Sequence, residues 1–163
     1  FGYVKERQFD MSLDFKPAPD AGAFQIGSPN IFSAAPVEGS LRIFHEAGLE
    51  RLREKSLHLT DYMIYLLDQT APEEKTGFSL ATPRKGARRG GHVAVEHEEA
   101  VRINEALKAR GVIPDFRYPN VIRLAPVPLY TSFADVWETV RHLREIVDKE
   151  EYTRFSTKRG EVA

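Results

Sequence analysis

The chain has 163 residues, a length that suits one domain with a single sizeable core. Its 23 basic and 24 acidic residues leave a net charge of −1, which argues against nucleic acid or an anionic membrane surface as a partner. The absence of cysteine excludes a disulfide scaffold, a thiolate metal site and a cysteine nucleophile. No apolar run is long enough to span a membrane, so we expect a cytoplasmic protein.

The first segment, residues 1–32, is rich in proline, glycine, aspartate and aromatic residues and has no sustained period. This composition predicts a loop arm with a turn at "GSPN", residues 27–30. The chain opens on "FGYVKERQFDM", without an initiator methionine, as if in the middle of a loop. Two expectations stay open here, a piece of a longer protein or a trimmed leader.

Helical periodicity dominates three later segments of the chain. Apolar residues recur at helical spacing from residue 33 to about residue 70, which predicts one long amphipathic helix or two, with Gly48 at the break. A further helix is predicted over residues 98–111, with Val101, Ile103 and Leu107 inward and Gly111 as its C-cap. The last predicted helix covers residues 133–152 and is capped by Thr131 or Ser132.

Short alternating segments predict strands at residues 78–83, 92–97, 113–117 and 121–126. The order strand, strand, helix, strand, strand, helix predicts an α+β fold, in which helices cover one face of a small mixed sheet. We expect residues 33–152 to form this domain, and residues 153–163 to be a frayed polar tail.

Most polar motifs do not indicate a catalytic or metal site. The five histidines show no ligand spacing, so no metal is expected, and no serine lies in a glycine-flanked elbow. The turn "RRGG", Arg88 to Gly91, could hold an anion, but an ordinary solvated turn is favoured.

Two positions are candidates for ligand contact. Arg123 interrupts an apolar run, and no nearby residue is an evident partner for it. It either points to water from an edge strand or clamps a carboxylate with its planar fork of donors. The second candidate is Ser28, which follows Gly27 in "GSP" and either presents its hydroxyl to a phosphate or belongs to an ordinary turn.

Longer motifs carry a family resemblance. The segments "GAFQIGSPNIFSAAPVEGSLRIFHEAGLERLREKSLHLTDYMIYLL", "RRGGHVAV" and "GVIPDFRYPNVIRLAPVPLYTSFADVWETV" resemble the C-terminal portion of the kynureninase family, from Phe1 to about Asp148. That family consists of pyridoxal-phosphate enzymes with the aspartate-aminotransferase fold, fold type I. The resemblance therefore implies the small C-terminal domain of such an enzyme.

The resemblance also implies a reaction and roles for residues. The reaction would be hydrolysis of L-kynurenine, or its 3-hydroxy form, to an anthranilate and L-alanine in a homodimer. Arg123 matches the family arginine that pairs with the substrate α-carboxylate, and Ser28 with Gly27 falls where the family contacts the cofactor phosphate or the ring of the neighbouring subunit's substrate. Tyr3 stands where many relatives have histidine.

The chain has eight lysines, and none lies in a context typical of a Schiff-base lysine. The resemblance thus implies that the large cofactor-binding domain is missing, and that the chain is inactive alone.

Two alternatives remain open. One is a related class V enzyme, such as a cysteine desulfurase or an aminotransferase. The other is a ferredoxin-like domain that binds a small regulatory molecule, since the same order of elements builds such domains. RNA binding is disfavoured, because the strands lack an aromatic cluster with basic neighbours.

Overall fold

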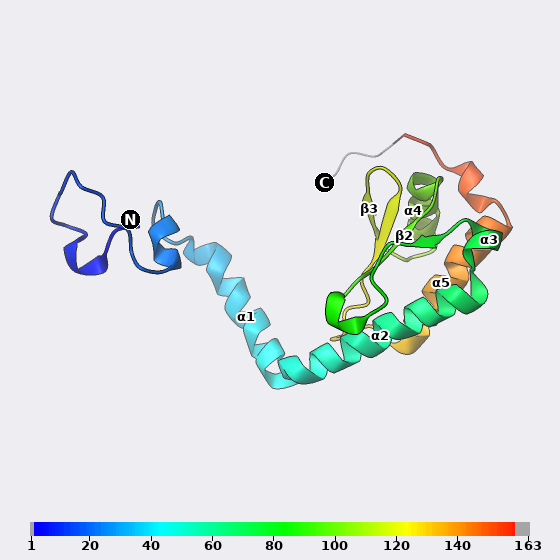
Figure 1. Ribbon diagram of the computed structural model, residues 1–163, viewed down its shortest axis with the longest axis horizontal. Helices are drawn as coiled ribbons and strands as arrows, with labels where there is room; N and C mark the ends of the chain where they lie inside the picture. Colours follow the sequence, from blue (N-terminus) through cyan, green and yellow to red (C-terminus); the bar gives the residue numbers. More distant parts are fainter. Residues whose placement is uncertain (1, 159–163) are drawn as a thin grey trace. The chain divides into compact units, whose positions relative to one another are not determined.

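The computed structural model describes residues 2–158 of the chain (Figure 1). The chain forms two compact units, Phe1–Glu46 and Ala47–Ala163. The expectation that residues 33–152 form one domain stays a prediction.

The first unit begins with a closed loop. Tyr3 and Pro17 form an isolated antiparallel bridge, and the Tyr3 hydroxyl donates to the Asp14 carbonyl at 3.2 Å. This unit also contains two short 3-10 helices, η1 (Lys5–Arg7) and η2 (Ala21–Phe24). The predicted loop arm is therefore mostly irregular, as its composition indicates.

The segment predicted as one long amphipathic helix or two forms two helices. Helix α1 (Ile31–Ala47) and helix α2 (Leu49–Thr70) are separated by Gly48, whose φ of 83° lies in a region that glycine adopts readily. The predicted break at Gly48 is confirmed. Helix α1 starts two residues earlier than expected, because the Asn30 side chain accepts a hydrogen bond from the Ser33 amide at 3.1 Å.

The second unit contains a four-stranded sheet in the order β1-β2-β4-β3. Its elements are, in chain order, α3 (Glu73–Thr76), β1 (Ser79–Leu80), η3 (Gly86–Arg88), β2 (Val93–Glu96), α4 (Ala100–Ala109), β3 (Asp115–Arg117), β4 (Val121–Leu124), α5 (Phe133–Asp148) and η4 (Glu151–Arg154). The predicted strands and helices are all present.

The sheet is antiparallel throughout, whereas the sequence predicted a mixed sheet. Helix α4 joins β2 to β3, and these two strands run in the same direction. However, β4 lies between them and pairs antiparallel with both, so no two parallel strands are neighbours.

The register divides the sheet into a covered face and an open face. Val93 pairs with Leu124, and Val95 pairs with Ile122; all four side chains are buried in the core. Helices α2, α4 and α5 pack together on this covered face, as the sequence predicted (Figure 1). Because side chains alternate along a strand, Arg123 and its partner Ala94 belong to the other, open face, where Arg123 is partly exposed although Ala94 itself is buried.

The two helices that follow strands differ in detail from their predictions. In α4, Ile103 and Leu107 are fully buried, but Val101 is only partly buried. Helix α4 starts at Ala100, two residues later than predicted, so Glu98 and Glu99 precede it. Gly111 has a φ of 83° just after the helix, as expected for its role.

Helix α5 begins with a capping box. The Ser132 hydroxyl accepts from the Asp135 amide at 3.2 Å, and the Asp135 carboxylate accepts from the Ser132 amide at 2.8 Å. This decides between the two predicted caps in favour of Ser132. Phe133 and Trp137 of α5 are apolar, yet each is 45% exposed. The buried face of α5 consists of Val136, Val140, Leu143 and Ile146.

The start of the predicted frayed tail is held in place. Arg102 of α4 donates to the carbonyls of Tyr152, Thr153 and Phe155, and Phe155 packs against the core. These bonds anchor the chain as far as Phe155, because they fix three backbone groups to one buried helix. Residues 159–163 of the predicted tail lie outside the described residues.

His97 links the end of β2 to helices α3 and α4. Its Nδ1 accepts from the Glu99 amide at 2.9 Å, so its Nε2 carries the proton and donates to the Thr76 carbonyl at 3.0 Å. The ring also lies 4.9 Å from the Phe78 ring, centre to centre. Burial lowers the pKa of His97 despite the opposing effect of the Thr76 carbonyl, because the charged imidazolium is poorly solvated there.

We therefore expect the free energy of unfolding to fall as the pH drops below about 6.5, the pKa of an unfolded histidine. The unfolded chain binds protons before folded His97 does, so this stability is present above that pH and is lost toward the lower folded pKa. His142, whose pKa burial also lowers, acts in the same direction. Urea titrations across this pH range measure the effect, and His97→Gln should reduce the slope. An unchanged slope would show that His97 is not responsible.

Candidate functional site

Arg123 lies near the centre of the sheet, on strand β4. Strand β4 has β2 on one side and β3 on the other, so the alternative in which Arg123 points to water from an edge strand is wrong. The arginine instead belongs to the open face, opposite the helices, and its side chain is 36% exposed. A cation that is fixed on the open face of a sheet is available to a ligand.

The open face also supplies Arg123 with a carboxylate partner, Asp115 of β3. Arg123 Nε donates to Asp115 Oδ2 at 2.7 Å, and Arg123 Nη2 donates to the same oxygen. Arg117 Nε donates to Asp115 Oδ2 as well, at 2.9 Å. The hydrogen bond from Arg123 is the main reason that the pKa of Asp115 lies below its usual value, and Arg117 adds to it.

The sequence-based statement that Arg123 has no evident partner nearby is therefore wrong. The β3–β4 hairpin turns around the cis peptide Tyr118–Pro119, and its register places Asp115 opposite Arg123. A signal for this was present, since "DFRYPNVIR" puts the two residues at equal distances from the turn.

Ser28 and Gly27 lie in the first unit, just before α1. Ser28 is exposed, and the Gly27 carbonyl accepts from the Gln25 side chain at 3.0 Å. A Cβ on Gly27 would meet nothing within 4 Å, so packing within the described part of the chain does not require glycine there. Whether Ser28 or Gly27 contacts a cofactor stays a prediction.

The "RRGG" turn holds a buried cation, which the sequence did not predict. The Arg89 side chain has 0% exposure and donates from Nε to Thr60 Oγ1 at 3.1 Å and from Nη1 to the Arg84 carbonyl at 2.7 Å. Its Nη2 donates to Asp61, which is 60% exposed. From α2, Arg53 donates to the Arg89 carbonyl at 3.0 Å. The turn is therefore fastened to α2 and is not merely solvated.

The lysines of this chain do not fit a Schiff base with pyridoxal phosphate. Seven of the eight are exposed on this chain, whereas a Schiff-base lysine is activated by burial in an apolar pocket or by a neighbouring cation. The eighth, Lys55, is partly buried, and its ammonium donates to the Pro128 carbonyl at 2.8 Å. We therefore derive no cofactor chemistry from a lysine of this chain.

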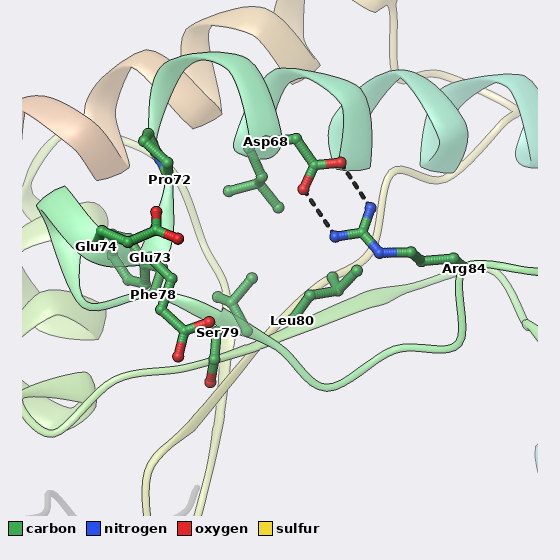
Figure 2. A pocket seen from close by; sticks show the side chains of 11 residues that line it. Asp68, Pro72, Glu73, Glu74, Phe78, Ser79, Leu80 and Arg84 are labelled. Atoms are coloured by element: carbon green, nitrogen blue, oxygen red, sulfur yellow. Dashed lines mark hydrogen bonds and ion pairs between the residues drawn. The ribbon is translucent and has the colours of Figure 1, made fainter.

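Three cavities of the second unit do not include the predicted site residues. Figure 2 shows one of about 260 Å³ between α2, α3 and β1, where Arg84 and Asp68 form a two-bonded ion pair at 2.6 and 2.8 Å. The hydrogen bond from Arg84 lowers the pKa of Asp68. A cavity of about 500 Å³ lies beside the "APVPLY" loop, and one of about 250 Å³ lies between α2 and α5. Arg123, Gly27 and Ser28 line none of the three.

Two kinds of site are not found among residues 2–158. No group of three or more histidine, aspartate or glutamate side chains is arranged to hold a metal ion in this described part. Within the same residues, no helix combines the length and the apolar character that crossing a membrane requires.

Comparison with known proteins links the Arg123 region to one family. A family model described as "Kynureninase C-terminal domain" matches residues 52–143, which include β3, β4 and most of α5. Kynureninases of Geobacillus thermodenitrificans and Bacillus thuringiensis subsp. konkukian are each 52% identical over 163 residues. That of Shouchella clausii is 51% identical over 163 residues. Each alignment covers 100% of this chain but only 38% of the relative.

A structural likeness agrees with the predicted fold. The apo structure of a cysteine desulfurase from Thermococcus onnurineus NA1 superposes with a TM-score of 0.67 at 17% identity, over 91% of this chain and 38% of that one. At that identity the likeness shows a shared fold only, whereas the family model covers more than half of the chain. The chain therefore belongs to the kynureninase family, and it corresponds to the C-terminal domain of those enzymes.

Proposed function

We propose that the full-length enzyme containing this chain hydrolyses L-kynurenine, or its 3-hydroxy form, to an anthranilate and L-alanine. The family match supports the reaction, because kynureninases are 52% identical over the whole of this chain. The observation that carries the role of this domain is the position of Arg123, a guanidinium on the open face of the sheet.

In this proposal, Arg123 binds the α-carboxylate of the amino-acid substrate. A guanidinium remains charged at any relevant pH, and its planar donors match the two oxygens of a carboxylate. The three side chains Arg117, Asp115 and Arg123 together carry a net charge of +1, which attracts an anion to this face. The domain would thus orient the substrate, while other residues complete the pocket.

The cofactor in this proposal is pyridoxal phosphate, held by a lysine outside this chain. When bound, it supplies the electron sink that cleavage of a carbon–carbon bond requires. Ser28 and Gly27 are proposed to contact its phosphate, because an exposed hydroxyl in a turn can donate to an anion. The enzyme is further proposed to be a homodimer that acts in the cytoplasm.

An assay of the full-length enzyme tests this function. We expect release of fluorescent anthranilate from L-kynurenine, and no sulfide from L-cysteine, which separates the proposal from a cysteine desulfurase. Cofactor absorbance reports whether pyridoxal phosphate is bound. Sulfide release without anthranilate would contradict the proposal and would favour the desulfurase.

A further inference from the structure

We infer that Asp115 is a positioning residue that holds one edge of the Arg123 guanidinium, so that the other edge faces the substrate carboxylate. The inference rests on the proposed role of Arg123. It adds a second residue to substrate recognition, one that acts through Arg123 and does not touch the substrate.

The two hydrogen bonds of the pair identify the edge that is occupied. A guanidinium has a side edge, formed by Nε and Nη2, and an end edge, formed by Nη1 and Nη2. Arg123 uses Nε and Nη2 to contact Asp115 Oδ2, so Asp115 lies against the side edge. The end edge has the geometry for a second, two-bonded carboxylate.

A second arginine–aspartate pair in the same unit shows the arrangement in which the end edge is occupied. Arg84 contacts both oxygens of Asp68 through Nη1 and Nη2, so the carboxylate occupies the end edge of that arginine (Figure 2). An incoming carboxylate would have to displace Asp68 there. At Arg123 it would not have to displace Asp115, because the two carboxylates would use different edges.

Asp115 is itself held in place, as a residue that positions Arg123 should be. Its Oδ2 accepts from Arg117 as well as from Arg123, and the register of β3 and β4 sets its backbone opposite that of Arg123. Arg117 also offsets the negative charge of Asp115, which would otherwise repel an incoming carboxylate. The side chain that holds Arg123 therefore comes with its own neutralising partner.

Asp115→Asn in the full-length enzyme tests the inference. Asparagine has nearly the same shape but lacks the charge that holds the guanidinium, so we expect the KM for L-kynurenine to rise about tenfold, with a much smaller change in kcat. Asp115→Glu, which restores a carboxylate, should recover most of the lost affinity. If Asp115 instead competed with the substrate for Arg123, Asp115→Asn would lower the KM. That result would overturn the inference.

Two comparisons separate a positioning effect from a general one. The decarboxylated analogue of kynurenine, measured as a competitive inhibitor, should bind wild type and Asp115→Asn equally, because it has no carboxylate for Arg123. Asp68→Asn is the matched control, since Asp68 is 41% exposed against 47% for Asp115 and also pairs with an arginine. Asp68→Asn should leave the KM unchanged. If Asp115→Asn weakened binding of the decarboxylated analogue as much as it weakened binding of L-kynurenine, the inference would be overturned.

A double-mutant cycle with Arg123→Lys distinguishes the two proposals. If Asp115 acts through Arg123, the double variant should have nearly the KM of Arg123→Lys alone. If Arg123→Lys leaves the KM unchanged, the carboxylate-binding role of Arg123 fails. If Arg123→Lys raises the KM but Asp115→Asn has no effect, or an additive one, only the positioning role fails.

Discussion

Arg123→Lys in the full-length enzyme is expected to lower kcat/KM for L-kynurenine by about 10- to 100-fold, mainly through a higher KM. Each charge-assisted hydrogen bond contributes roughly 1.5 to 3 kcal/mol, and each 1.4 kcal/mol corresponds to a factor of about ten. Lysine keeps the charge but not the planar fork, so it cannot contact Asp115 and a substrate carboxylate in the same geometry. Steady-state kinetics with anthranilate fluorescence measures the change.

The control for this variant is Arg84→Lys. Arg84 is also an arginine with an aspartate partner, but it lies beside the cavity of Figure 2 and has no proposed contact with substrate. Its kcat/KM should remain within about twofold of wild type. Both variants should keep the cofactor absorbance of the wild-type enzyme. An unchanged kcat/KM for Arg123→Lys would remove the proposed carboxylate contact.

Arg89→Ala is expected to lower the free energy of unfolding of this chain by about 3 kcal/mol. The substitution removes a fully buried side chain and its hydrogen bonds to Thr60 and to the Arg84 carbonyl. A buried acceptor without a partner costs roughly 1 to 3 kcal/mol, and the cavity left by the side chain adds to this. Asp61 adds little, because it is exposed and water solvates its carboxylate.

Urea unfolding, followed by circular dichroism and by the fluorescence of the single tryptophan, Trp137, measures this loss. Arg88→Ala is the matched control, because Arg88 is the preceding residue of the same turn and is exposed. It should change the free energy of unfolding by no more than about 0.5 kcal/mol. Equal midpoints for the two variants would show that burial of Arg89 does not stabilise the fold.

The strand that carries Arg123 could be predicted from the sequence, but its place in the sheet could not. The strand around Arg123 was predicted, because its apolar residues mark it locally. Its position inside the sheet was not, since order among strands depends on contacts between distant segments. The role of Arg123 toward a substrate remains a proposal, supported by the family match and by its place on the open face.

The sequence by itself determined the four longer helices α1, α2, α4 and α5, the approximate positions of the strands, the break at Gly48 and the family, since periodicity, glycine and long motifs are local properties of the chain. The short helix α3 was not predicted. Only the tertiary structure decided that the sheet is antiparallel, that Arg89 is buried against α2 and that Asp115 holds Arg123. The physical reason is that a side chain's partners depend on strand register and helix packing. Both are set by residues far apart in the chain.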